Sequence, residues 1–178
     1  MKFVVVPSGT GCNDSESQQL IKANSITEIL QERREVETET FSAEETMELG
    51  RALAVFFHPG EVVALFGDLG SGKTTLIKGI VAGLGAPEAV TSPTFTIQHQ
   101  YHGAELAIYH FDFYRIDTPA ALRTIGCEEF FDGEGVCLIE WPDRALDLLP
   151  PERWEIFLQQ PSNVTTQRKI SIRWRTQP

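Results

Sequence analysis

The sequence predicts an α/β fold: a three-layer sandwich around a central sheet that is mainly parallel, with added antiparallel strands. First, residues 62–66 form an apolar run that leads through a glycine-rich turn into residues with apolar side chains at helical spacing. Second, residues 136–139 have the composition of a buried strand. Third, residues 96–101 and 106–113 alternate in polarity around a polar turn, which predicts a hairpin. Helices alternating with buried strands indicate a sheet covered on both faces.

Composition limits the kinds of function. The 178 residues are 42% hydrophobic and 22% charged, which is typical of a globular protein with a core. A net charge of −10 argues against a protein that binds nucleic acid without a partner, because binding to phosphates is dominated by Lys and Arg. The apolar runs are too short for a membrane span or a signal peptide, so we expect a cytoplasmic location and no membrane partner. Cys12, Cys127 and Cys137 lack metal-ligand spacing and are expected to be reduced thiols in apolar surroundings.

Residues 1–37 read as an N-terminal extension of unknown role. We expect a short strand at residues 3–6, a loop at residues 8–17 and a helix within residues 18–34. Residues 38–178 are expected to form the main domain.

The remaining elements of the main domain follow in order. Residues 36–41 predict an edge strand, and Ser42 with Glu45 forms a capping box that opens a helix ending near residues 58–60. Residues 119–125 predict a short helix capped by Asp117 or Thr118. Residues 154–158 and 169–174 predict two late strands.

Residues 67–74, with the sequence GDLGSGKT, match the phosphate-binding loop G-x-x-x-x-G-K-[ST]. Glycines allow the backbone N–H groups to approach phosphate, and the following helix adds its positive end. Lys73 is expected to reach the terminal phosphates, and the Thr74 hydroxyl to bind Mg²⁺. The motif predicts a P-loop NTPase-like fold with bound nucleotide and Mg²⁺. The expected nucleotide-binding residues of this segment are Asp68, Leu69, Gly70, Ser71, Gly72, Lys73, Thr74 and Thr75.

Two carboxylates are candidates for the chemistry. Glu140 ends the apolar run 136–139, where an acidic residue can share the metal with Thr74; the alternative is a solvent-exposed strand end. Asp112 lies in the segment HFDFYR, where alternation places it on the same face as His110. It either orients or deprotonates the attacking water, or forms a structural pair with Arg115 or His110.

Two further residues are candidates for nucleotide contacts. Thr94, in the hydroxyl-rich segment TSPTF, either senses the γ-phosphate or caps a proline turn. Trp141 follows Glu140 and either covers the nucleotide, contacts a partner or packs in the core.

Together, the blocks GDLGSGKTT, SPTF, HFDFYR and IEWP resemble the TsaE family, the P-loop ATPase of bacterial tRNA threonylcarbamoyladenosine biosynthesis. The resemblance covers roughly residues 38–150 in order and spacing. The first 37 or so residues exceed the family's usual start.

The resemblance implies slow hydrolysis of ATP with Mg²⁺. It also implies docking onto a threonylcarbamoyl transferase and its paralogous scaffold subunit, which modify the adenosine next to the anticodon, so that tRNA is met only through these partners. Carried over by position, Lys73 and Glu140 are catalytic, Thr74 and Glu140 hold the metal, and Asp112 is a catalytic or water-positioning candidate. Thr75, Thr94 and Trp141 lie near the nucleotide or partner.

Two other functions fit the phosphate loop. In a free-standing small-molecule or nucleoside kinase, Asp112 would activate an acceptor hydroxyl and Arg115 would bind the acceptor. However, the expected arginine-bearing lid is missing between residues 84 and 136. In a non-enzymatic adaptor, the nucleotide would only set the protein's shape.

Overall fold

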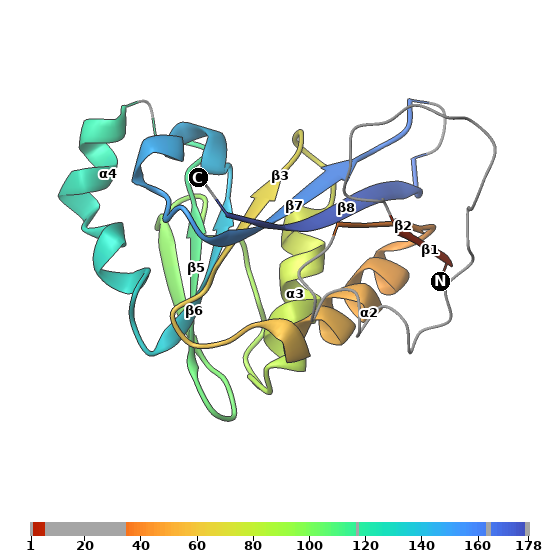
Figure 1. Cartoon of the computed structure of the whole chain (residues 1–178), viewed down its shortest axis with the longest axis horizontal. Coiled ribbons are helices and arrows are strands. Elements are labelled where there is room, and N and C mark those ends of the chain that lie inside the picture. Colours follow the sequence, from red (N-terminus) through yellow and green to blue (C-terminus); the bar gives the residue numbers. More distant parts are fainter. Residues whose placement is uncertain (1, 6–34, 117, 163–164, 177–178) are drawn as a thin grey trace.

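The computed structural model describes residues 2–5, 35–116, 118–162 and 165–176 (Figure 1). These residues build one sheet of eight strands in the order β1-β2-β8-β7-β3-β6-β5-β4. The strands are β1 (Lys2–Val5), β2 (Val36–Thr40), β3 (Val62–Phe66), β4 (Gln98–His102), β5 (Ala107–Asp112), β6 (Gly135–Glu140), β7 (Arg153–Gln159) and β8 (Arg168–Arg175).

The middle of the sheet is parallel and its flanks are antiparallel. Strand β3 pairs in parallel with β6 and β7, and β6 pairs in parallel with β5. Antiparallel pairs join β4 to β5 on one side, and β7, β8, β2 and β1 in succession on the other. The predicted fold class, including the hairpin formed by β4 and β5, is therefore confirmed.

Helices and short turns cover both faces of the sheet. Helices α2 (Ala43–Leu53) and α3 (Lys73–Gly83) lie side by side beneath the strands, and α4 (Pro119–Ile125) lies at the far left (Figure 1). Alternation along β3 divides the core, because Val63 and Leu65 pack with α2 and α3, whereas Val62 and Ala64 pack with Leu122 of α4. On the α4 face of the sheet, the covering layer also contains 3₁₀ turns at Cys127–Phe130, Pro142–Arg144 and Leu146–Leu148.

Glycines bring α2 and α3 into close contact. A Cβ atom placed on Gly79 would lie 2.0 Å from the carbonyl oxygen of Met47, and one on Gly50 would lie 2.3 Å from that of Leu76. Both distances are far below van der Waals contact, so the two backbones approach as closely as they do only because these side chains are absent. This contact fixes α3, the helix that follows the phosphate loop, against its neighbour.

The start of α2 confirms the predicted capping box. The Ser42 hydroxyl accepts a hydrogen bond from the Glu45 N–H at 3.1 Å, and the Glu45 carboxylate accepts one from the Phe41 N–H at 3.0 Å. At the other end, α2 stops at Leu53 and a 3₁₀ turn over Ala54–Phe56 follows, so the helix ends before residues 58–60. In α4, the Thr118 hydroxyl provides the cap by accepting from the Ala121 N–H.

Some predictions differ from the structure. Strand β2 is not an edge strand, because β1 pairs with it on the side away from β8. Strand β4 begins at Gln98, since the N–H groups of Thr96 and Ile97 both donate to the Pro93 carbonyl in a turn. The helix expected within residues 18–34 lies outside the described residues.

The cysteines of the described chain are buried and unpaired. Cys127 and Cys137 are free thiols with no exposed surface, in agreement with the expected apolar packing. Burial raises the pKa of the Cys137 thiol to about 12, which keeps it protonated and unreactive at neutral pH. No helix in the part of the chain that the structure describes has both the length and the apolar character needed to cross a membrane.

The glycine contact between α2 and α3 makes a prediction about stability. Although alanine favours helix more than glycine does, Gly79→Ala is expected to lower the free energy of unfolding by about 2 kcal/mol, because the added methyl group has no room. Urea denaturation measures the change. Gly133→Ala is the control, since its Cβ atom would meet nothing closer than 3.5 Å. Equal stability of the two variants would contradict the packing argument.

Candidate nucleotide-binding site

The phosphate loop joins β3 to α3 and depends on glycine. Gly67, Gly70 and Gly72 have φ angles of 141°, 78° and 104°, a region that other residues rarely adopt. A Cβ atom on Gly67 would also lie 2.3 Å from the carbonyl oxygen of Leu158 in β7. The loop therefore has the tight course expected from its motif, and Gly72 caps α3 without a side chain.

Lys73 is the first residue of α3 and lies at the mouth of the loop. Its ammonium group donates hydrogen bonds to the carbonyl oxygens of Gly67 at 2.7 Å and Asp68 at 3.0 Å, and lies 4.0 Å from the centre of the Trp141 ring. Burial lowers the pKa of Lys73, and nearby carboxylates, Glu140 foremost, oppose that shift. The loop thus holds a partly desolvated cation beside several acidic groups, which is the charge pattern of a site for phosphate and metal.

Glu140 and Thr74 meet beside the loop. Strand β6 lies next to β3 in parallel register, so both strands end at the same edge of the sheet. The Thr74 hydroxyl donates a hydrogen bond of 2.8 Å to the Glu140 carboxylate, which is 3% exposed. The alternative of a solvent-exposed carboxylate is therefore wrong.

The oxygens of Thr74 and Glu140 suit Mg²⁺. Hydroxyl and carboxylate oxygens are hard donors, and Mg²⁺ takes few protein ligands when it also binds phosphate. Within the described residues, no group of three or more His, Cys, Asp or Glu side chains forms a dedicated metal cage. The pair therefore fits a metal held jointly by protein and nucleotide.

Asp112 lies one strand further along the same edge, as the register partner of Glu140. Its carboxylate accepts hydrogen bonds from the hydroxyls of Ser92 at 2.8 Å and Thr94 at 2.5 Å, and from the Tyr114 N–H at 2.9 Å. The structure thus joins two predicted site residues, Asp112 and Thr94, that are 18 positions apart in sequence.

Neither structural pair considered for Asp112 is the one that forms. The Arg115 guanidinium lies 4.2 Å from the centre of the Phe95 ring, and both residues are exposed. His110 bonds to Glu140 instead, with 3.0 Å between Nε2 and the carboxylate oxygen. Asp112 is therefore held by hydroxyl and backbone donors and is 3% exposed, and its carboxylate is one of those that act on Lys73.

His110 is a site residue whose partner the sequence did not identify. It is fully buried, and the same Glu140 oxygen receives its Nε2 and the Thr74 hydroxyl. This contact of Nε2 holds the carboxylate in the orientation in which it faces Thr74. Alternation placed His110 on the face of Asp112, but its partner depends on the pairing of β5 with β6, which no local pattern reveals.

Trp141 has a strained backbone next to the site. Its φ of 59° and ψ of 47° are left-handed, a conformation that costs non-glycine residues roughly 1–2 kcal/mol. The half-buried ring lies 4.8 Å from the Tyr114 ring, centre to centre, and contacts the Lys73 ammonium. It also packs on the core layer of α4, so core packing and a place beside the loop coexist.

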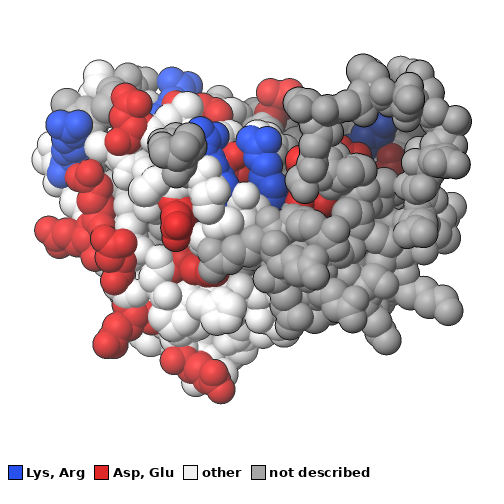
Figure 2. Space-filling view, viewed as in Figure 1, with Lys and Arg blue, Asp and Glu red and all other residues white. Residues whose placement is uncertain are grey.

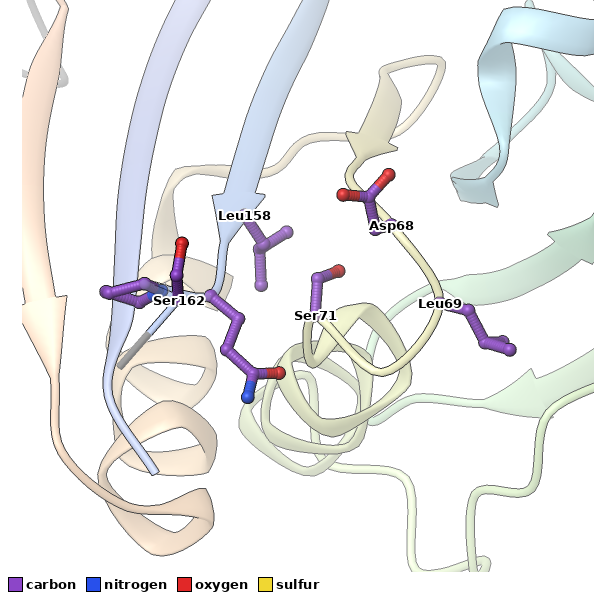
Figure 3. A pocket seen from close by; sticks show the side chains of 7 residues that line it. Asp68, Leu69, Ser71, Leu158 and Ser162 are labelled. Carbon is purple, nitrogen blue, oxygen red and sulfur yellow. The ribbon is translucent and has the colours of Figure 1, made fainter. Parts of the chain in front are cut away.

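The remaining predicted residues line the flank of the loop. Leu69 is 75% exposed at its tip, and Thr75 is half-buried in the first turn of α3. A shallow pocket of about 240 Å³ lies between the loop and the end of β7, where the Ser71 and Leu158 side chains approach each other (Figure 3). Ser71 is buried, and its hydroxyl has no hydrogen-bond partner among the described residues. The pocket is lined by Asp68, Leu69, Ser71, Leu158, Gln160, Pro161 and Ser162.

The fold and the site define a nucleotide-binding protein of the P-loop class. The family model for threonylcarbamoyl adenosine biosynthesis protein TsaE matches residues 40–170. The chain belongs to the TsaE family, and its relatives are named for tRNA threonylcarbamoyladenosine biosynthesis. This membership does not favour the kinase interpretation.

Individual relatives cover most of the chain. The TsaE protein of Bacillus subtilis (strain 168) is 41% identical over 127 residues, which span 71% of this chain and 79% of that protein. The TsaE protein of Treponema pallidum (strain Nichols) is 43% identical over 109 residues, or 61% of this chain and 80% of that protein. A crystal structure of YdiB from Bacillus subtilis superposes with a TM-score of 0.68 at 36% identity, covering 81% of this chain and 87% of that one.

Lys73 provides a direct test of the loop. Lys73→Ala is expected to weaken ADP and ATP binding roughly 30-fold, because it removes charge-assisted hydrogen bonds to phosphate that are together worth about 2 kcal/mol. Calorimetric titration of the nucleotide measures the change. Lys78→Ala is the control, since Lys78 is exposed on the same helix, away from the loop. Unchanged affinity of Lys73→Ala would exclude this loop as the phosphate site.

Proposed function

We propose that this protein hydrolyses ATP with Mg²⁺, slowly when alone, and that hydrolysis supports tRNA threonylcarbamoyladenosine modification next to the anticodon. The observation that carries the proposal is the meeting of three parts at one edge of the sheet. These parts are the phosphate loop with Lys73, the Thr74–Glu140 pair, and Asp112 with its two hydroxyl donors. Phosphoryl transfer from ATP to water needs these functions: phosphate binding, a metal site and a group that orients water.

Each residue has a role that follows from its position. Mg²⁺ held by Thr74 and Glu140 would neutralise charge on the phosphates. Lys73 binds the terminal phosphates through its ammonium group, and His110 fixes the Glu140 carboxylate. The loop N–H groups and the positive end of α3 hold the phosphate chain.

Asp112 acts on the attacking water in this proposal. Its carboxylate accepts from Ser92 and Thr94, so the hydroxyl-bearing turn is tied to the end of β5. A γ-phosphate beside Thr94 would draw that hydroxyl away and leave a carboxylate oxygen to accept a hydrogen bond from water. Water then attacks the γ-phosphorus, its proton passes to Asp112 or to phosphate, and ADP leaves. Thr94 thereby serves as the sensor of the γ-phosphate.

The surface around the loop favours a protein partner. Leu69 of the loop is 75% exposed, and Phe95 and Tyr114, each next to a residue or group that binds Asp112, are 83% and 40% exposed. Phe95 and Tyr114 flank the segment that carries Asp112, so a protein bound there would shield the site from water. We propose that the partners are the threonylcarbamoyl transferase and its paralogous scaffold subunit, in the cytoplasm.

Charge argues that tRNA is held by the partners. The chain has a net charge of −10, and acidic side chains are spread over the lower left of the face in Figure 2. The described part of that face has no continuous patch of Lys and Arg. Since nucleic-acid affinity comes mainly from phosphate neutralisation, this protein would reach tRNA through the complex.

Asp112→Asn tests the proposed chemistry. The amide keeps the size of the side chain but is a far weaker base and water-orienting group. ATP affinity is therefore expected to stay within about threefold of wild type, while phosphate release falls on the order of 100-fold. Calorimetry and a phosphate-release assay measure the two effects. Asp147→Asn is the control, because Asp147 is exposed in a 3₁₀ turn away from the site. Undiminished phosphate release by Asp112→Asn would overturn the role of Asp112, and phosphate transferred to an added nucleoside would favour a kinase.

A further inference from the structure

We propose that Arg168 is a positioning residue that holds the phosphate loop in its nucleotide-binding conformation. Arg168 is the first residue of β8 and lies 97 positions after Ser71. Its Nε donates a hydrogen bond of 2.7 Å to the Ser71 carbonyl oxygen, and a terminal nitrogen donates one of 3.0 Å to that of Gly70. A single guanidinium therefore grips two consecutive peptide groups of the loop. This inference rests on the proposed nucleotide site.

The bond to Ser71 orients an N–H group toward the phosphates. The peptide bond is planar and trans, so its C=O and N–H point in opposite directions. With the Ser71 carbonyl turned toward Arg168, the Gly72 N–H that shares this peptide points away from Arg168, the direction in which we place the phosphates. The Gly70 carbonyl belongs to the peptide whose N–H, on Ser71, closes a turn with the Asp68 carbonyl. Arg168 thus fixes both the turn and one phosphate-facing donor.

The contacts of Arg168 with the described residues leave its positive charge without a neutralising carboxylate. Its other terminal nitrogen donates to the carbonyl oxygens of Thr165 and Gln167, so all the hydrogen bonds it makes with described residues go to backbone carbonyls. None of the carboxylates that the structure describes forms an ion pair with it. A cation behind the loop, unpaired within this part of the chain, favours the binding of an anion in front of it.

The fold also explains why this position is fixed. Arg168 is the register partner of Thr40 at the end of β2, and the antiparallel flank thereby reaches the loop. A Cβ atom on Gly72 would lie 3.6 Å from Arg168 Nε and 3.9 Å from Leu158 Cδ2, so the guanidinium packs directly against the loop backbone. The planar fork matters as much as the charge, because a lysine ammonium cannot span two carbonyls in the same geometry.

Two variants of the full chain test the proposal. Arg168→Gln is expected to weaken binding of ADP with Mg²⁺ about tenfold and to raise the KM for ATP by the same factor, while kcat changes less than about twofold. This pattern is the mark of lost uniform binding, since the loop holds phosphate equally in the ground and transition states. Arg168→Lys keeps the charge but not the fork and is expected to weaken binding about threefold. Calorimetry measures the affinities, and a phosphate-release assay gives KM and kcat.

Lys169→Gln is the matched control, because Lys169 is the next residue of β8, its side chain is 62% exposed, and among the described residues its ion pair is a 4.0 Å contact with Glu39. It should bind ADP like wild type. If the role of Arg168 is purely structural, Arg168→Gln will melt at a lower temperature than wild type. Its ADP affinity, measured well below that temperature, will then be unchanged. That result would overturn the proposal, as would a fall in kcat at unchanged affinity.

Other outcomes remain decisive. If Arg168→Gln fails to fold, the ADP affinity of Arg168→Lys tests the proposal instead. An affinity of Arg168→Lys equal to that of wild type would contradict it. If the wild-type protein itself does not bind ADP, the proposed nucleotide site fails. If wild type binds ADP and both variants bind equally well, only the role of Arg168 fails.

Discussion

The hydrogen bond between the Thr74 hydroxyl and the Glu140 carboxylate is the contact on which the site depends. At 2.8 Å it joins the start of α3 to the end of β6, two segments 66 residues apart. It forms only because β6 lies next to β3 in parallel register, which brings the end of the acidic strand level with the loop. The parallel pairing of β5 with β6 aligns Asp112 with Glu140, so one arrangement of three strands places the Thr74–Glu140 pair and the Asp112 carboxylate together.

This arrangement is costly, because charged groups are buried. Lys73, Asp112 and Glu140 are each 4% exposed or less, and His110 is fully buried. Every one of them has hydrogen-bond partners, which offsets part of the desolvation cost. Apolar layers pack on both faces of β3, and α2 and α3 are in close contact at Gly50 and Gly79. This packing stabilises the fold and offsets the cost of burying the charged groups of the site.

The sequence predicted those features that depend on residues near one another in the chain. The loop, its helix and the capping box at Ser42 have local patterns, and the structure has them as expected. Glu140 is predictable as a site residue because the apolar run before it indicates a buried strand that ends in an acidic residue. The predicted edge position of β2 was wrong because the polarity of a strand does not reveal that a short segment such as β1 covers it.

Contacts between distant segments were beyond local patterns. The bond of His110 to Glu140 depends on the pairing of β5 with β6, and that of Arg168 to the loop depends on β8 returning beside β7. Arg168 reads in the sequence as an ordinary polar residue at the start of a strand. For the same reason, the sequence suggested Arg115 or His110 as the partner of Asp112, whereas the hydroxyls of Ser92 and Thr94, about 20 residues earlier in the chain, bind its carboxylate.

The Mg²⁺ dependence of ATP hydrolysis by wild type and Glu140→Gln tests the central claim most directly. The claim is that Thr74 and Glu140 hold a metal that the phosphate loop shares through ATP. We expect no phosphate release without Mg²⁺, and we expect Glu140→Gln to need about tenfold more Mg²⁺ for half-maximal release, because an amide replaces a carboxylate in the metal's surroundings. Identical Mg²⁺ dependence of the two proteins, or hydrolysis by wild type in excess EDTA, would contradict the account.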